Sequence, residues 1–310
     1  MNVAVIGAGG VGGLLAALLA RMGHDVAILA RGEALAAIRA RGIVARTAKD
    51  ETIEVAVRAS DDAAELGRAD VVLVAVKAWQ VEAMAPRLAP LVGEGTLVVP
   101  LQNGVDAADT LAKSLGTAAV TGGLCHMLSW IESPGVIRAI GAPPSVTVGP
   151  RDPSQRARID ALVTALRAAG VHTVVPDDVN VALWEKFIFL EPFGAVGAVT
   201  RSPVATVRTT ASSRALLIGA AREVEAVGRA RGVAIPDDAV ARAIQRVESL
   251  PADATASLQR DLEAGRPSEL ADLTGAVVRH AEATGTPTPI HGVLWGALEP
   301  WEARARQGGV

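Results

Sequence analysis

Lysine is rare in this chain, and its positions mark the best candidates for proton chemistry. The 30 basic side chains include only four lysines, and all the others are arginines. Arginine keeps its proton in a protein, whereas lysine can release one. A lysine in this sequence therefore marks a place where arginine would not serve. The four are Lys49, Lys77, Lys113 and Lys186.

Lys186 is the candidate for acid–base catalysis. It stands in the sequence ALWEKFIF, close to Trp184, Phe187 and Phe189. Apolar surroundings disfavour a charged ammonium and lower its pKa, which suits a lysine to act as a general acid near neutral pH. The alternative is a lysine on an amphipathic helix, whose stem covers apolar surface while its charge stays in water.

Two more polar residues follow apolar runs that are typical of parallel strands. Lys77 follows VVLVAV, and Asn103 comes shortly after TLVVPL. The carboxyl ends of such strands meet at one edge of the sheet, where ligands bind. We therefore expect both side chains on the nicotinamide side of a cofactor crevice. The alternatives are that Lys77 is a solvated lysine at the end of a strand and that Asn103 belongs to a plain Asn-Gly turn.

Two carboxylates near the C-terminus are a further candidate pair. Glu269 and Asp272 are three residues apart, so a helix would place them on one face. Ser268 has the side chain of an N-cap and predicts the start of that helix. The alternative is a cap followed by solvated carboxylates.

Glycines at the N-terminus predict where a nucleotide binds. The apolar run Val3–Ile6 stops at GAGGVGG, and an apolar helical stretch follows at once. In such a strand–turn–helix, the first glycine permits the turn, the second lets a phosphate approach and the third allows close packing. The helix N-terminus also favours a pyrophosphate. A purely structural turn is the alternative. The dinucleotide-binding residues predicted here are Gly7, Gly9, Gly10, Val11 and Gly12.

The end of the second strand indicates which dinucleotide is preferred. The run Val26–Leu29 ends in Ala30 and Arg31, where an NAD site usually has a carboxylate for the ribose 2′-hydroxyl. A carboxylate would repel a 2′-phosphate, whereas the guanidinium of Arg31 binds it in a fork. The sequence therefore favours NADP(H) over NAD(H), and an ordinary surface arginine is the alternative.

The order of the predicted elements indicates two domains. Strands and helices alternate up to residue 175, which predicts a Rossmann-type, doubly wound parallel sheet. After Pro176 only helical periodicity follows. We expect a dinucleotide-binding domain over 1–176 and an all-helical substrate and catalytic domain over 177–310, with the chemistry in the cleft between them. The helices predicted in the second domain are Val179–Leu190, Ala215–Arg231, Asp237–Val247, Leu270–Thr284 and His291–Arg306.

Composition excludes several classes of function. The net charge is −3 and no basic patch is dense, so nucleic acid is not an expected partner. No apolar run approaches the roughly 18 residues that span a membrane, and the N-terminus lacks the features of a signal peptide. Cys125 is the single cysteine, and the five histidines show no metal-ligand spacing, so no metal is expected. We expect a cytoplasmic enzyme. The sequence does not decide whether it forms a homodimer.

Taken together and in this order, the motifs resemble the ketopantoate reductase (2-dehydropantoate 2-reductase) family. The family has a Rossmann domain and a helical domain, and it reduces a 2-oxo acid to a 2-hydroxy acid with NADPH in pantothenate biosynthesis. The resemblance covers nearly the whole chain. It rests on GAGGVGG, on LAR ending at Arg31, on VKAWQ (76–80), LQNG (101–104), LWEK (183–186) and SLQRDLEAGRPSEL (257–270).

The resemblance implies a role for each matching residue. Lys186 would be the catalytic general acid, and Glu269 its acidic partner at the substrate or the ribose. Arg31 would bind the 2′-phosphate. The other implied contacts are Lys77, Gln80 and Asn103 to the cofactor and Ser257 to the substrate.

Three positions depart from the family pattern. Leu190 and Gly194, four and eight residues after Lys186, and Ala254 stand where the family usually has asparagine. Pro192 leaves the helix register after Leu190 open, and Glu191 has no evident role. A substrate site at Leu190 and Gly194 would lack hydrogen-bonding groups and discriminate poorly for ketopantoate. The alternatives are a reductase of a different, more apolar carbonyl compound and a non-catalytic NADP-binding protein.

Overall fold

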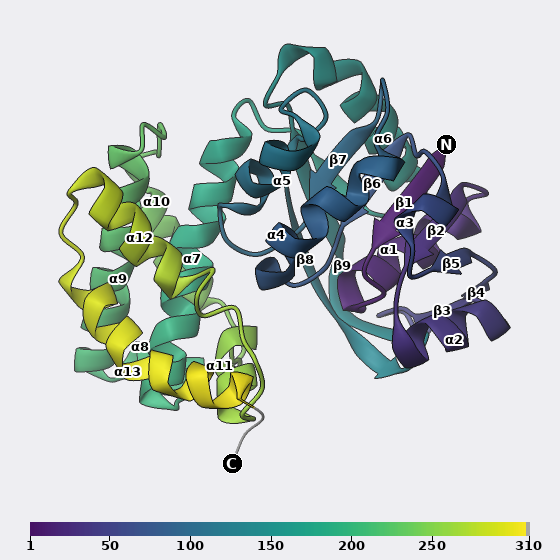
Figure 1. The fold of residues 1–310 in the computed structure, drawn as a ribbon. Coiled ribbons are helices and arrows are strands. Elements are labelled where there is room, and N and C mark those ends of the chain that lie inside the picture. The colour runs from purple at the N-terminus through teal and green to yellow at the C-terminus, as the bar shows by residue number, and fades with distance from the viewer. Residues whose placement is uncertain (308–310) are drawn as a thin grey trace. The chain divides into compact units, whose positions relative to one another are not determined.

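In the computed structural model, which describes residues 1–307, contacts divide the chain into two units (Figure 1). The N-terminal unit consists of Met1–Gln102 and Ala107–Val179. The helical unit consists of Asn103–Asp106 and the chain from Asn180 onward. The short segment Asn103–Asp106 therefore packs with residues that follow it by many positions in the sequence.

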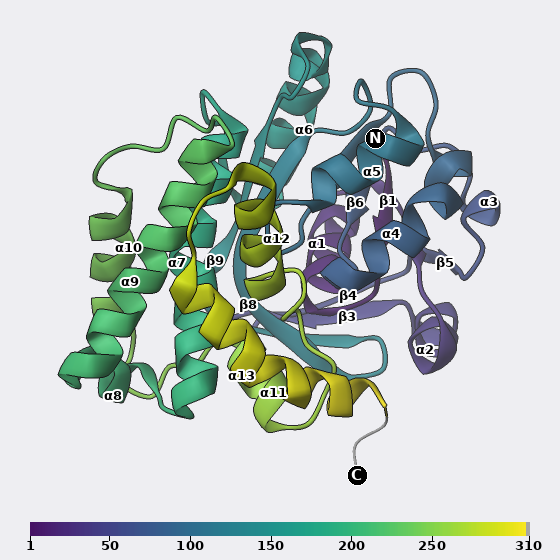
Figure 2. The same ribbon diagram turned by 60° about the vertical axis from the view of Figure 1, so that its left-hand side comes forward.

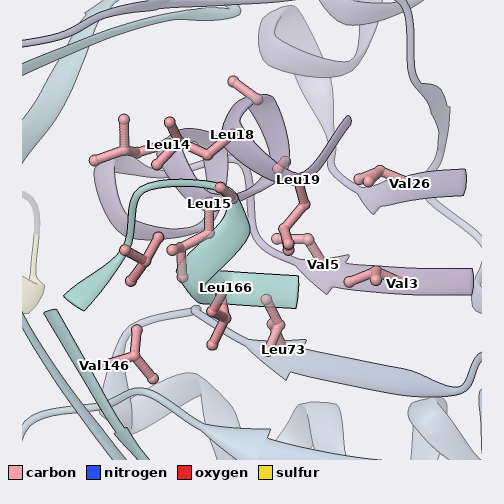
Figure 3. Close-up of a cluster of buried hydrophobic side chains, with 14 of the residues drawn as sticks. Val3, Val5, Leu14, Leu15, Leu18, Leu19, Val26, Leu73, Val146 and Leu166 are labelled. Atoms are coloured by element: carbon pink, nitrogen blue, oxygen red, sulfur yellow. The ribbon is translucent and has the colours of Figure 1, made fainter. Parts of the chain in front are cut away.

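A five-stranded parallel sheet forms the centre of the N-terminal unit, with strand order β5-β2-β1-β6-β7. Val3 and Val5 of β1 pack on one face with leucines of α1 (Figure 3). Ala4 and Ile6 belong to a separate cluster on the other face, with Leu88. Burial on both faces explains why these strands are continuous apolar runs. The strands are β1 (Asn2–Ile6), β2 (Asp25–Leu29), β5 (Arg58–Ser60), β6 (Val71–Val74) and β7 (Leu97–Pro100).

The predicted fold class, a doubly wound parallel sheet followed by a helical region, is confirmed. The helices of the N-terminal unit are α1 (Gly10–Arg21), α2 (Gly32–Arg41), α3 (Ala63–Leu66), α4 (Val81–Met84), α5 (Ala107–Leu115) and α6 (Arg156–Ala168), with short 3₁₀ helices at Ala78–Gln80, Ala85–Leu91 and Pro153–Gln155.

A second, mixed sheet belongs to the same unit, and the sequence did not predict it as a separate sheet. Its path is β10-β9-β3-β4, and β8 pairs with β9. The sequence predicts three separate strands in this region, and they form one long antiparallel hairpin, which turns at Gly135 with φ +74°. The predicted strands are Leu124–Ile131, Gly135–Ile140 and Ser145–Gly149. The strands are β3 (Ile43–Arg46), β4 (Thr52–Val55), β8 (Gly122–Ser133), β9 (Val136–Gly149) and β10 (His172–Val174).

In the second unit, the described residues form helices joined by turns and loops, with no strand. Helix α9 packs against α8, α10, α12 and α13 (Figure 2). The sequence did not predict α8 and α11 as helices. The helices are α7 (Val179–Thr200), α8 (Val204–Thr209), α9 (Ala211–Ala230), α10 (Ala239–Glu248), α11 (Ser257–Glu263), α12 (Thr274–Thr284) and α13 (Pro289–Arg306).

Helix α7 is longer than predicted, because it continues through Pro192 to Thr200. A proline inside a helix removes one backbone hydrogen bond, and here the helix continues without it. The open question of register is thereby answered. Lys186, Leu190 and Gly194 lie on one helix at i, i+4 and i+8, and so share one side of it.

The prediction for the start of α12 was wrong. The helix begins at Thr274 rather than Leu270, with Leu273 as its N-cap. Ser268 is therefore not the cap of this helix, and Glu269 and Asp272 lie in the turn before it. We call residues 268–274 the acidic turn.

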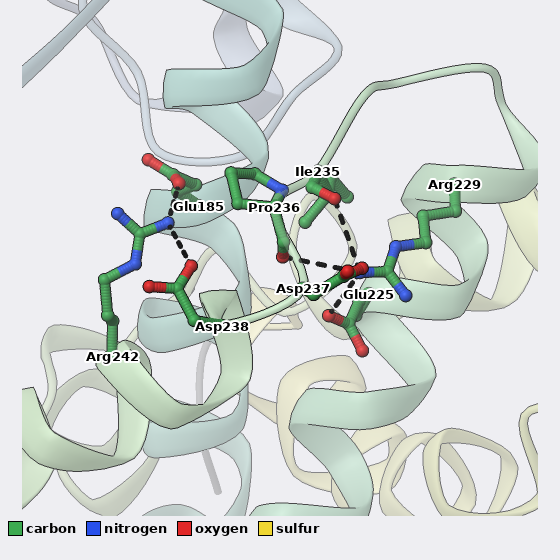
Figure 4. Close-up of polar contacts among 8 residues, drawn as sticks. All are labelled: Glu185, Glu225, Arg229, Ile235, Pro236, Asp237, Asp238 and Arg242. Carbon is green, nitrogen blue, oxygen red and sulfur yellow. Dashed lines mark hydrogen bonds and ion pairs between the residues drawn. The ribbon is translucent and has the colours of Figure 1, made fainter.

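Exposed ion pairs tie the start of α10 to its neighbours (Figure 4). Arg242 pairs with Asp238 at 3.2 Å and with Glu185 of α7. Arg229 pairs with Asp237 at 3.0 Å and Glu225 at 3.2 Å. Exposed pairs of this kind contribute roughly 0–1 kcal/mol each. Their relevance here is that the carboxylate of Glu185, next to Lys186 in the chain, is engaged by Arg242.

Candidate functional site

The glycine turn after β1 has the geometry that a dinucleotide site needs. Gly7 has φ +103°, a conformation that favours glycine, and its N–H donates to the carbonyl of Leu29 at 3.0 Å. A Cβ on Gly12 would lie 2.1 Å from the carbonyl oxygen of Gly7. The first and third glycines therefore permit the turn and the close approach of α1 to β1.

Gly9 and Gly10 are glycines for different reasons. Gly9 is the N-cap of α1, and apart from its own chain neighbours no atom of the described residues lies within 4 Å of the place where a Cβ would stand. That open space beside the first N–H groups of a helix suits an approaching phosphate. Gly10 is demanded by the fold, because a Cβ there would lie 2.3 Å from the carbonyl oxygen of Ser129 in β8. Val11, the next predicted contact, is half-buried in the first turn of α1.

Arg31 and Lys77 follow strands that end at the same edge of the parallel sheet. Arg31 is exposed, and its side chain makes no hydrogen bond or ion pair with residues 1–307. Lys77 is also exposed, with Nζ 5.6 Å from the ring centre of Trp79. Gln80 has a local role, since its Oε1 accepts the backbone N–H of Lys77 at 3.1 Å. Two cations thus stand near the glycine turn, where a phosphate-bearing cofactor would benefit from them.

Lys186, Asn103 and Glu269 meet in the helical unit. Nζ of Lys186 donates to Oδ1 of Asn103 at 3.0 Å, and Nδ2 of Asn103 donates to Oε2 of Glu269 at 3.1 Å. The amide therefore presents its oxygen to the ammonium and its nitrogen to the carboxylate, the pairing that its donor and acceptor groups allow. The result is a hydrogen-bonded chain of ammonium, amide and carboxylate from three distant segments.

The surroundings of Lys186 differ from the apolar pocket expected from its neighbours in sequence. Trp184 and Phe187 are buried in the helical core, with ring centres 5.6 Å apart. Phe189 is half-buried and lies under the guanidinium of Arg246 at 4.6 Å. A helix turns by about 100° per residue, so side chains that are close in sequence face different surroundings.

The loop that carries Asn103 is fixed to the helical unit by Asp106. Oδ1 of Asp106 lies 2.7 Å from Nε2 of His280, and Oδ2 lies 3.5 Å from Arg279. Burial disfavours the charged carboxylate, but the hydrogen bond and charge of His280, with Arg279, lower the pKa of Asp106. A Cβ on Gly104 would lie 2.9 Å from the carbonyl oxygen of Asp272, so the loop also sits tightly against the acidic turn.

The acidic turn is attached to α13 through Ser268. Its backbone N–H and hydroxyl both donate to the carboxylate of Glu302 in α13. Glu269 is buried, and its charge adds to the effect of burial on Asp272, which raises the pKa of Asp272 to about 6. Ser268, predicted as a helix cap, thus attaches to α13 the turn that carries the carboxylates of Glu269 and Asp272.

The substrate positions predicted on α7 and α11 differ in accessibility. Leu190 is half-buried, and so is Ser257, the first residue of α11. Gly194 is buried, and a Cβ there would lie 3.3 Å from Leu258 and 3.6 Å from Ala256. The absence of a side chain at 194 therefore leaves no gap, because α11 fills the space.

Residues 1–307 contain no group of three or more histidine, cysteine, aspartate or glutamate side chains that could hold a metal ion. Within the same residues, no helix has the length and apolar character needed to cross a bilayer.

Comparisons with known proteins agree across both units. The model of the family described as ketopantoate reductase PanE/ApbA matches residues 3–153, and the model of its C-terminal region matches residues 178–302. A 2-dehydropantoate 2-reductase of Mesorhizobium japonicum is 32% identical over an alignment of 311 positions. The alignment covers 93% of this chain and 94% of the relative.

Solved structures share the whole fold. A PanE/ApbA family ketopantoate reductase from Ralstonia eutropha JMP134 is 33% identical, with a TM-score of 0.90 over 99% of this chain and 100% of that chain. A D-mandelate dehydrogenase in a ternary structure with NADH and anilino(oxo)acetate has a TM-score of 0.89 over the same shares of the two chains. It is only 20% identical, so this likeness is one of fold.

Proposed function

Because this chain belongs to the ketopantoate reductase family, and so to the oxidoreductases, we propose that it reduces a 2-oxo acid to a 2-hydroxy acid with NADPH. The observation that carries the proposal is the hydrogen-bonded chain from Lys186 through Asn103 to Glu269. A non-catalytic NADP-binding protein would have no use for a lysine held in this way.

We assign cofactor binding to residues 1–176 and substrate binding to residues 177–310. The glycine turn, with the open space beside Gly9, would hold the pyrophosphate at the N-terminus of α1. Arg31 would hold the 2′-phosphate, and Lys77 stands at the same sheet edge. When bound, NADPH supplies the hydride for the carbonyl carbon.

Lys186 is assigned the proton for the other half of the reduction. A hydride on the carbonyl carbon leaves negative charge on the oxygen, and the Lys186 ammonium gives that oxygen a proton. Asn103 orients the ammonium by accepting one of its N–H groups. Glu269 fixes the amide of Asn103 by accepting an N–H from it.

A more apolar 2-oxo acid than ketopantoate is the second candidate substrate. Leu190 follows Lys186 by one helical turn, where an amide would be needed to hold a hydroxylated acid. Leu258 and Ala256 close the space at Gly194. With Leu190 one turn from the proposed acid and no hydrogen-bonding group at Gly194, a substrate whose side chain is apolar is favoured.

Exchanging Arg31 for aspartate tests the cofactor assignment. The change replaces a phosphate clamp by a repelling charge, so we expect the preference for NADPH over NADH to fall by about 10- to 100-fold. Each charge-assisted hydrogen bond contributes roughly 1.5–3 kcal/mol, and about 1.4 kcal/mol is tenfold in affinity. Titration of both dinucleotides by fluorescence gives the two dissociation constants.

Arg68→Asp is the matched control for this prediction. Arg68 is exposed in the same unit but precedes β6, at the opposite edge of the sheet, so the charge change is the same and the place is different. Its dinucleotide preference should equal that of the unmodified protein. Equal affinity of the unmodified protein for NADH and NADPH would refute the assignment of Arg31.

A further inference from the structure

Glu191, to which the sequence assigns no role, is a fully buried carboxylate on α7. Its Oε1 accepts the hydroxyl of Thr274 at 2.8 Å, and its Oε2 lies 2.8 Å from Nε2 of His291. Thr274 is the first residue of α12, and His291 lies in the first turn of α13. One carboxylate therefore connects α7 to the beginnings of two other helices.

His291 completes the cluster by bridging two carboxylates. Its Nδ1 lies 2.7 Å from Glu223 of α9, which also accepts the backbone N–H groups of Ile290 and His291 and so caps α13. Burial disfavours the charged imidazole, but Glu191 and Glu223 outweigh burial and raise the pKa of His291 to about 9. Near neutral pH the imidazole is thus a cation that donates to both carboxylates.

The acidic turn is held at both of its ends by these contacts. At the first end Ser268 donates to Glu302 of α13. At the second end Thr274 donates to Glu191 of α7. Glu269 lies between the two anchors and accepts from Asn103, which in turn accepts from Lys186 of the same helix α7. Helix α7 and the acidic turn are therefore joined twice, once at Lys186 and once at Glu191.

We propose that Glu191 is a positioning residue for the reduction, which acts through the Thr274 hydroxyl to keep Glu269 in place against Asn103 and Lys186. The proposal rests on the proposed function of Lys186. Burying a carboxylate costs free energy, and an apolar side chain at position 191 would hold the helices together equally well. Stability alone therefore does not explain Glu191. A hydrogen bond has a direction, so it also fixes the axial position of α7 relative to the turn.

Two substitutions at Thr274 separate the hydroxyl from the rest of the side chain. Thr274→Val keeps the shape and removes the donor, whereas Thr274→Ser keeps the donor and removes a methyl group. Thr200→Val is the matched control, because Thr200 lies on α7, is half-buried and also loses its hydroxyl donor, which contacts the carbonyl oxygens of Val196 at 2.7 Å and Gly197 at 3.3 Å. If Thr274→Val does not fold, Thr274→Ala gives the same comparison with Thr274→Ser.

The first readout is turnover. We expect Thr274→Val to lower kcat by roughly 10-fold or more with an unchanged KM for NADPH, since a misplacement of about 1 Å costs on the order of 10²-fold. Thr274→Ser and Thr200→Val should keep kcat within about twofold. Equal kcat values for Thr274→Val and Thr200→Val, with only their thermal stability lowered, would overturn the proposal.

The second readout does not depend on activity. With only four lysines in the chain, reductive ¹³C-methylation gives few NMR signals, and Lys186→Arg identifies the one from Lys186. Thr274→Val should move the Lys186 signal, and Thr274→Ser should not. An unmoved signal in Thr274→Val contradicts the positioning role. If no 2-oxo acid is reduced, the proposed function fails, and this comparison still decides whether Thr274 affects Lys186.

Discussion

Replacing Lys186 with alanine is expected to lower kcat for 2-oxo acid reduction by about 10²–10⁴-fold, the usual contribution of a general acid. The glycine turn and Arg31 belong to the other unit, so the dissociation constant for NADPH should stay unchanged. Stopped-flow NADPH oxidation at saturating substrate measures the first quantity, and fluorescence titration measures the second.

Two further variants define what the lysine does. Lys186→Arg keeps a positive charge but cannot release its proton, so it should be almost as slow as Lys186→Ala. Lys113→Ala removes an exposed lysine from α5 and should turn over normally. Near-normal turnover in Lys186→Arg would mean that the lysine only binds the substrate carboxylate.

Ketopantoate should be a poor substrate, with a kcat/KM lower by about two to four powers of ten than that of an enzyme with both amides on α7. Leu190 and Gly194 offer no hydrogen bonds, and each lost bond to a charged group is worth roughly 1.5–3 kcal/mol. A bulkier or more apolar 2-oxo acid should be reduced faster. A kcat/KM for ketopantoate above about 10⁵ M⁻¹s⁻¹, well inside the usual enzyme range, would contradict this prediction.

Leu190→Asn tests the physical reason. Leu190 is half-buried, so an amide there has access to a substrate, and we expect the efficiency for ketopantoate to rise by about tenfold. Leu190→Ala is the control, because it makes room without adding a hydrogen bond. Gly194→Asn alone should not help, since Leu258 stands 3.3 Å from the first carbon of any side chain added there. An equal gain in Leu190→Ala would point to size rather than hydrogen bonding.

The glycine turn and the parallel sheet were predictable because their signals are local. A strand, a turn and a helix follow one another within about 20 residues, and each glycine has its own steric reason. Even here the sequence missed one cause. Gly10 is a glycine because β8 crosses it, and β8 lies more than a hundred residues later in the chain.

Contacts between distant segments could not be predicted. The sequence places Asn103 after a strand of the sheet, whereas its side chain bonds to Lys186 and Glu269 in the helical unit. The sequence predicts separate strands within β9, because the glycine and prolines at 141–144 are typical of turns. In the fold they lie inside a long ribbon, near a shift in its register.

The buried ionisable residues and their partners could not be predicted from the sequence either. In the sequence Glu191 has no evident role, and His291 shows no metal-ligand spacing. The partners of Glu191 are Thr274 and His291, which lie 83 and 100 residues away along the chain. A buried carboxylate needs a compensating partner, and only the fold shows which residues provide it.

Hydride transfer itself gives the most direct test of the central claim. The protein would be incubated with NADPH deuterated at the transferable position of C4 and with a panel of 2-oxo acids that includes ketopantoate and larger apolar members. We predict oxidation of NADPH and a 2-hydroxy acid with one deuterium on C2, and no such product with Lys186→Ala over the same time. Tight binding of NADPH without reduction of any member would contradict the account and favour a non-catalytic NADP-binding protein.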